Sequence, residues 1–108
     1  MIILYTKAVR IYLWELVETL YFNNYFGCKV SARGYVHELI KEMESTIHIK
    51  QKHKSPSDFS RYGKDVWYVS YPKNKRTTWY FFFTYHPEDD IYFIHYITNN
   101  HVAGHLLE

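Results

Sequence analysis

The sequence predicts an α+β fold in which a helical hairpin packs on one face of a four-stranded, mainly antiparallel sheet. Apolar residues recur at helical spacing over two stretches in the first half of the chain. A short apolar run precedes them, and three aromatic-rich runs separated by turn residues fill the second half. The predicted order is therefore strand, helix, helix, strand, strand, strand, which suits a two-layer domain.

The chain length and composition set the frame for this prediction. A chain of 108 residues is the size of one domain, so we expect residues 1–108 to form a single unit. Hydrophobic residues make up 47%, which argues against disorder. The net charge of +2 permits a polyanionic partner without requiring one.

The first strand and the first helix follow from residues 2–23. The apolar run IILY at 2–5 predicts a short strand that pairs alongside the last three. Thr6 is a candidate N-cap for a helix over residues 7–23. The residues that form the apolar stripe of this helix are Val9, Leu13, Leu16, Val17 and Leu20.

The second helix is predicted from Ser31, as its cap, to about Lys52. Its apolar face consists of Val36, Leu39, Ile40, Met43 and Ile47. The segment before it contains Gly27, which we expect to lie in a turn. Cys28 is the single cysteine, so no internal disulfide forms, and we interpret it as structural.

Three strands are predicted at residues 66–71, 78–85 and 91–98, joined as an antiparallel meander. The middle one is apolar on both faces, as expected of a central strand. Strict alternation in the last one divides it into two faces. One face carries Ile91, Phe93, His95 and Ile97, and the other carries Tyr92, Ile94, Tyr96 and Thr98. The face of the sheet away from the helices is expected to be partly open and rich in Tyr, Trp and His.

Polar residues follow the last strand: Asn99, Asn100, His101 and His105. They can end the strand, bind a metal or act on a substrate. The two histidines are four apart, which suits zinc on a helix, but Gly104 lies between them and no third ligand is evident. The stretch HELIK at 37–41 fails the H-E-x-x-H pattern because position 41 is Lys. We therefore expect neither a metal nor a cofactor.

The start of the chain is also informative about location. It has no charged region before its apolar part and no small-residue cleavage site, so it does not resemble a signal peptide. Its longest uncharged run is far shorter than a membrane span. We expect a cytoplasmic protein with no membrane contact.

Four stretches and the order of the elements carry a family resemblance. They are ILYTKAVRIYLWELVETLY (3–21), SDFSRYGKDVWYVSY (57–71), RTTWYFFFTYHPEDDIYFIHYIT (76–98) and the tail NNHVAGHLL (99–107). In these the chain resembles the RelE/ParE superfamily of bacterial toxins, the toxic halves of type II toxin–antitoxin pairs. The order of elements is the stronger part of the resemblance.

The resemblance implies a cognate antitoxin as partner. It also implies ribosome-dependent cleavage of messenger RNA, with the RNA 2′-hydroxyl as nucleophile. Other members of the family poison DNA gyrase and cut nothing, which gives a second hypothesis. A third is a degenerate toxin that only binds its antitoxin. The family's arginine of the third strand would fall near Tyr80 and is missing here, which favours that third hypothesis.

The resemblance also implies site residues. The family's basic cluster corresponds to Lys73, Lys75 and Arg76, in the turn before the middle strand of the meander. Its functional tail corresponds to Asn99, Asn100 and His101. We expect His101, Arg76 and Asn100 to act in catalysis. The residues expected to bind substrate are Lys73, Lys75, Tyr80, Tyr96 and Asn99.

The chemistry of these residue types agrees with that assignment. Cleavage by a 2′-hydroxyl needs a base, an acid and positive charge on the phosphorane-like transition state. Histidine titrates near neutrality, which suits His101, and Arg76 can hold phosphate in a bidentate fork. Tyr80 and Tyr96 can stack on bases. A meander brings Arg76 close to Asn99.

Plainer interpretations remain open for the same residues. The asparagine pair can simply end a strand, and the basic turn can be an ordinary solvated hairpin tip. A histidine inside a strand, such as His95, is more often packed and hydrogen-bonded than catalytic.

Overall fold

The computed structural model describes residues 1–22 and 29–107. The predicted turn at Gly27 and the lone Cys28 lie outside the described residues. The elements along the chain are β1 (Ile2–Tyr5), α1 (Lys7–Phe22), α2 (Lys29–Thr46), β2 (His53–Lys54), the 3₁₀ helix η1 (Ser57–Tyr62), β3 (Trp67–Pro72), β4 (Thr78–His86), β5 (Ile91–Asn99) and α3 (Asn100–Leu107).

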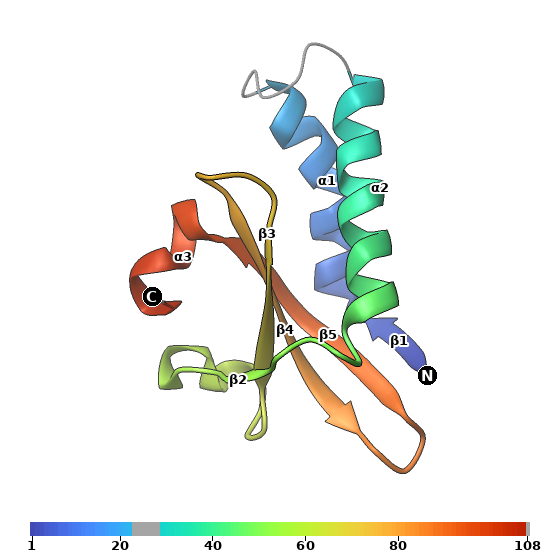
Figure 1. The fold of residues 1–108 in the computed structure, drawn as a ribbon, viewed down its shortest axis with the longest axis vertical. Helices are drawn as coiled ribbons and strands as arrows, with labels where there is room; N and C mark the ends of the chain where they lie inside the picture. The colour runs from blue at the N-terminus through green and yellow to red at the C-terminus, as the bar shows by residue number, and fades with distance from the viewer. Residues whose placement is uncertain (23–28, 108) are drawn as a thin grey trace.

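The described strands form one open sheet in the order β1-β5-β4-β3-β2 (Figure 1). β1 lies parallel to β5, and the other neighbours are antiparallel. The α+β class and the meander of the last three strands are therefore confirmed. The sheet has five strands rather than the predicted four, because His53 and Lys54 pair with Tyr68 and Trp67. That segment carries too few residues to show a strand pattern.

The helix boundaries agree with the prediction at some ends only. Thr6 caps α1 as predicted, since its Oγ1 accepts a 3.1 Å hydrogen bond from the Val9 amide. The predicted bounds of the second helix were wrong at both ends. Ser31 lies inside α2, and α2 ends at Thr46 instead of continuing to Lys52. Ile47 is fully buried and extends the apolar spacing, but it sits in a turn that follows the helix.

The main core lies between the helical hairpin and one face of the sheet (Figure 1). The helices contribute Leu16, Leu39 and Met43, and the strands contribute Trp79 and Phe81. These side chains are almost completely buried. Burying a Leu, Met or Phe side chain stabilises a fold by about 1.5–3 kcal/mol, so this layer dominates the stability of the domain.

The opposite face of the sheet carries a second, smaller core, which corrects the prediction of a partly open face. Phe59 from η1 stacks on Phe82 from β4 with ring centroids 4.3 Å apart. Ala103 from α3 is buried in the same cluster, with Leu106 and Leu107 packed against it. The 3₁₀ helix and the C-terminal helix thus cover aromatic residues that the sequence suggested were exposed.

A β-bulge changes the faces of the last strand. Phe82 pairs with Tyr96 and Phe83 pairs with Ile94, so His95 is an extra residue on β5. Ile94 and Ile97 consequently both pack in the main core, while Tyr96 packs in the second cluster. The predicted grouping of Ile97 with Phe93 and His95 was wrong because strict alternation does not continue across the bulge.

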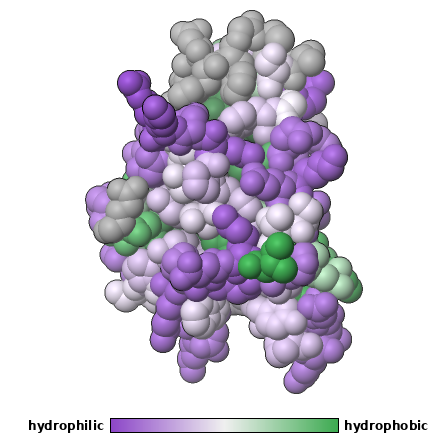
Figure 2. Space-filling view, viewed as in Figure 1, coloured by the Kyte–Doolittle hydropathy of each residue, from purple (hydrophilic) through white to green (hydrophobic). Residues whose placement is uncertain are grey.

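The surface seen from the side of Figure 1 is mostly polar, with small separate apolar areas (Figure 2). Within the described ranges, no helix is both long enough and apolar enough to cross a membrane.

Candidate functional site

The asparagine pair connects the end of β5 to the turn between β3 and β4. The Asn100 side-chain Nδ2 donates a 2.9 Å hydrogen bond to the Arg76 carbonyl oxygen. Its Oδ1 accepts a 2.8 Å bond from the Thr78 amide. Asn100 therefore uses both ends of its amide to hold the basic turn in place. The expected closeness of Arg76 to the tail is observed.

Asn99 has a different structural role, because it caps α3. Its Oδ1 accepts hydrogen bonds from the backbone amides of His101 at 2.9 Å and Val102 at 3.2 Å. These bonds satisfy two amides at the helix start, and an asparagine is a preferred residue for such a cap. The polar tail of the sequence is thus the beginning of a helix of eight residues.

His101 lies on the first turn of α3 and faces the same turn between β3 and β4. Its Nε2 lies 3.1 Å from the Thr77 hydroxyl oxygen. This contact orients the imidazole ring and leaves Nδ1 for another partner. His101 is exposed to solvent, so a ligand can reach it.

A cleft of about 640 Å³ opens beside His101. It lies between the helical hairpin and the end of the sheet where β5 passes into α3. Tyr12 and Glu15 come from α1, Tyr35 comes from α2, and Asn99 comes from β5. Volumes of this order hold small molecules or a single nucleotide. The remaining lining residues are Leu16, Thr19, Leu20, Asn74, Thr77, Trp79, His101 and Val102.

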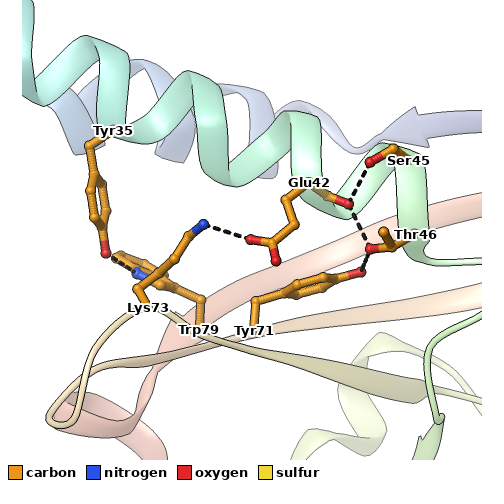
Figure 3. Close-up of polar contacts among 7 residues, drawn as sticks. All are labelled: Tyr35, Glu42, Ser45, Thr46, Tyr71, Lys73 and Trp79. Carbon is orange, nitrogen blue, oxygen red and sulfur yellow. Dashed lines mark hydrogen bonds and ion pairs between the residues drawn. The ribbon is translucent and has the colours of Figure 1, made fainter.

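Polar contacts fix α2 to the sheet next to this cleft (Figure 3). The Trp79 indole Nε1 donates a 2.8 Å hydrogen bond to the Tyr35 hydroxyl. Further along α2, the Thr46 and Tyr71 hydroxyls lie 3.1 Å apart. Burial is the largest cause of a raised Tyr71 pKa. These contacts connect α2 to β3 and β4.

The three basic residues of the turn do not share one environment. Lys73 forms an ion pair with Glu42 on α2, with 2.6 Å between Nζ and Oε1 (Figure 3). Lys75 and Arg76 are exposed. Neither Lys75 nor Arg76 has an acidic partner within the described part of the chain, whereas Lys73 has one.

The two tyrosines predicted to stack on substrate lie away from the cleft. Tyr80 is 5% exposed and belongs to the second core. Tyr96 packs against the same cluster, with its ring stacked on Tyr62 at 5.1 Å. Neither tyrosine is among the residues that line the cleft beside His101, and Tyr80 offers almost no ring surface to a nucleobase.

His95, at the bulge, is packed and hydrogen-bonded. Its Nε2 lies 2.9 Å from the Thr84 hydroxyl oxygen, and its ring stacks on Phe93 at 4.9 Å. The same hydroxyl lies 3.0 Å from Nε2 of His86. Burial, and then the charge of His86, lower the pKa of His95. His95 is not among the residues that line the cleft.

Sequence reasoning missed the aromatic and hydroxyl residues of the cleft, namely Tyr12, Thr19, Tyr35 and Thr77. Tyr12 occupies an inward position of an amphipathic helix, and such positions normally indicate core packing. Burial raises its pKa to about 12, so the phenol stays protonated at neutral pH. Within the described residues, no group of three or more His, Cys, Asp or Glu side chains is arranged to hold a metal ion.

No protein-family model, no curated protein and no solved structure matches this chain. The candidate site is therefore defined by the structure: a cleft beside the exposed His101, next to the turn that carries the exposed Lys75 and Arg76.

Proposed function

We propose that the chain is a RelE/ParE-like toxin domain that cleaves messenger RNA on the ribosome, with the RNA 2′-hydroxyl as nucleophile. One observation carries the proposal. His101 lies at the cleft and contacts Thr77, while the neighbouring Asn100 is bonded to the main chain of Arg76. The imidazole of His101 and the main chain of Arg76 are thereby held at the same turn.

The chemistry assigned to this arrangement is simple. Through Nδ1, His101 takes the proton of the attacking 2′-hydroxyl or gives a proton to the leaving oxygen, since Nε2 contacts the Thr77 hydroxyl. Arg76 and Lys75 stabilise negative charge on the phosphate in the transition state. Asn99 and Asn100 act indirectly, because their amides position α3 and the turn. Lys73 contributes less charge than the other two cations, since Glu42 pairs with it.

A second candidate is a domain that only binds its antitoxin. It is favoured by Tyr80, which the resemblance puts at the position of the family's strand arginine and which is buried in the second core. In that case the cations of the turn serve partner binding alone.

The test is induction of the chain in a bacterial host, with mapping of RNA 5′ ends within minutes. We expect new ends inside translated regions, and we expect His101→Gln to abolish them, because Gln can keep a hydrogen bond to Thr77 but cannot transfer a proton. His105→Gln is the matched control, since His105 is also exposed on α3.

The other outcomes separate the alternatives. Growth arrest with intact messenger RNA indicates another target, such as DNA gyrase. Absence of arrest with a folded chain indicates the binding domain. Cleavage that survives both His101→Gln and Arg76→Gln contradicts the mechanism at these residues.

A further inference from the structure

α1 forms one wall of the cleft described above, through side chains that recur at helical spacing. Leu16 is buried against the main core, and Tyr12 is partly exposed. Glu15 and Thr19 line the same cleft and are exposed to solvent. Residues three and four apart lie on one side of a helix, so Glu15 belongs to the same wall as Tyr12 and Thr19.

Glu15 differs in charge from the rest of this wall. Among the described residues that line the cleft, Glu15 alone carries a carboxylate. The Thr19 hydroxyl donates to the main-chain carbonyl of Glu15 and does not occupy its side chain. Within residues 1–22 and 29–107, the carboxylate has neither a hydrogen bond nor an ion pair. Two acceptor oxygens are therefore available to hydrogen-bond donors of a ligand.

Another wall of the cleft belongs to the turn between β3 and β4. Asn74 and Thr77 line the cleft, and the exposed Lys75 and Arg76 lie between them in the chain. The cleft is thus bordered by a carboxylate on α1 and by the turn that carries two cations. A ligand that suits both borders has hydrogen-bond donors at one end and negative charge at the other.

We propose that the cleft binds the base of a guanine nucleotide in RNA, with the Glu15 carboxylate accepting hydrogen bonds from guanine N1–H and from its 2-amino group. The adjoining phosphate is held by Lys75 and Arg76. This inference rests on the proposed function, because it takes RNA as the substrate, and it adds the base that the site selects.

Guanine is the RNA base whose Watson–Crick edge matches a carboxylate. Its N1–H and 2-amino group are neighbouring donors, and a carboxylate offers two neighbouring acceptors. Adenine and cytosine each present one amino donor beside a ring-nitrogen acceptor. Uracil presents one N–H between two carbonyl oxygens. An acceptor beside the donor repels the second carboxylate oxygen, so each of these three bases loses a hydrogen bond that guanine makes.

The cleft also offers aromatic surface for a base. Tyr12 and Tyr35 are partly exposed and line it from two different helices. The Trp79 indole donates a 2.8 Å hydrogen bond to the Tyr35 hydroxyl, which fixes the position of that phenol (Figure 3). Stacking on aromatic rings is tolerant of base identity. The rings therefore supply affinity for any base, and Glu15 supplies the selection.

A basic side chain of a partner protein is the other ligand that a carboxylate attracts. Lys75 and Arg76 argue against it, because they repel a further guanidinium or ammonium group at the border of the cleft. A nucleotide avoids this repulsion, since its phosphate is negative and its base is neutral.

Nuclear magnetic resonance on the purified chain tests the inference without requiring cleavage. Each of the four nucleoside 3′-monophosphates is titrated to about 10 mM, which detects a millimolar dissociation constant. The readout is the indole N–H signal of Trp79, which lines the cleft. The indoles of Trp14 and Trp67 report nonspecific stacking, since neither residue lines the cleft. Guanosine monophosphate is expected to shift the Trp79 signal and to bind about ten-fold or more tightly than the others.

Glu15→Gln gives the sharpest comparison, because it keeps the shape of the side chain and replaces one acceptor with a donor. The amide matches adenine, which presents a donor beside an acceptor. We expect guanosine monophosphate to bind about ten-fold or more weakly and adenosine monophosphate to bind more tightly than before. Glu38→Gln, at an exposed position of α2 outside the cleft lining, is the matched control and is expected to change neither affinity. Circular dichroism establishes that both variants are folded.

Mapping of RNA ends separates this inference from the proposed function. Wild-type cuts are expected beside guanine, and Glu15→Gln is expected to lose that preference. Cleavage that uses all four bases equally overturns the guanine site and leaves the cleavage proposal standing. Selective binding of guanosine monophosphate by a chain that cuts no RNA supports the guanine site and contradicts the cleavage proposal.

Three binding results also overturn the guanine site. One is a folded chain whose Trp79 signal responds to none of the four nucleotides. Another is a Trp79 signal that responds to N-acetylarginine amide in place of the nucleotides, which indicates a basic protein partner. The third is a preference for guanosine monophosphate that persists in Glu15→Gln, which assigns the selection to another group.

Discussion

The Asn100 side chain donates a 2.9 Å hydrogen bond to the main-chain carbonyl of Arg76, which joins the start of α3 to the turn between β3 and β4. A second bond, from the Thr78 amide to Asn100 Oδ1, completes a two-point contact. This amide and the contact between His101 and Thr77 together connect α3 to the turn that carries the exposed cations.

We therefore expect Asn100→Ala to lower the free energy of unfolding by about 1–2 kcal/mol, the effect of removing one or two hydrogen bonds. Urea denaturation measures this change. Asn74→Ala is the comparison for the same turn, because Asn74 Oδ1 accepts a bond from the Arg76 amide and the contact stays within the turn. An Asn100→Ala chain of unchanged stability contradicts the structural assignment.

Asn99 allows a separate test of the helix cap. Replacing it with Ala removes the acceptor for the His101 and Val102 amides, and we expect a loss of about 1 kcal/mol. Asn99→Asp keeps an acceptor and is expected to retain nearly all of the stability. Hydrogen exchange should show faster exchange of the α3 amides in Asn99→Ala. Equal exchange in the two variants argues against the cap.

The second core predicts a strong effect at a residue outside the main core. Phe59 stacks on Phe82 and is buried, so Phe59→Ala is expected to cost about 3–5 kcal/mol. Trp67→Ala on β3 is the contrasting variant, since Trp67 is exposed, and its effect should be much smaller. Thermal or urea unfolding compares the two. A small effect of Phe59→Ala shows that η1 is not packed on the sheet.

His95 predicts the pH dependence of stability. Its pKa is lowered in the folded chain, by burial and then by the charge of His86. The unfolded state therefore binds more protons in mildly acid solution, and stability falls as the pH drops through the ordinary pKa of 6.5. The contribution of His95 is fully present above that pH.

The matched variants are His95→Gln, which keeps a partner for Thr84, and His37→Gln at an exposed position on α2. Unfolding midpoints between about pH 5 and 8, the range in which histidine titrates, should vary less with pH in His95→Gln only. Equal pH dependence in wild type and His95→Gln assigns the effect to another group.

Local sequence patterns were sufficient for much of the fold. The helical spacing of Val9, Leu16 and Leu20 identified α1, and Thr6 identified its cap, because both signals lie within a few residues of one another. The turn residues around Lys73 and Pro87 likewise located the meander. Each of these features depends on short-range steric and hydrogen-bonding preferences.

The features that the sequence did not reveal depend on contacts across the fold. The bulge at His95 is defined by its pairing with β4, and no single-strand pattern indicates it. α3 contains Gly104, which is unfavourable inside helices, and packing of Ala103 on the second core stabilises it. The closeness of Arg76 to the tail was predicted, but the burial of Tyr80 in the second core could be seen only once the faces of the sheet were known.

The pairing of β1 with β5 has a consequence for the timing of folding. Ile2 lies beside Ile91, so β1 can pair only when β5, the last strand of the sheet along the chain, is present. Long-range parallel pairing of this kind requires closure of a large loop and is slow. We expect β1 to join last, and pulse-labelled exchange during refolding should show its amides gaining protection after those of β3 and β4. During synthesis β1 therefore has no sheet partner until the β5 segment has left the ribosome, so any activity that needs the complete sheet begins only after that point.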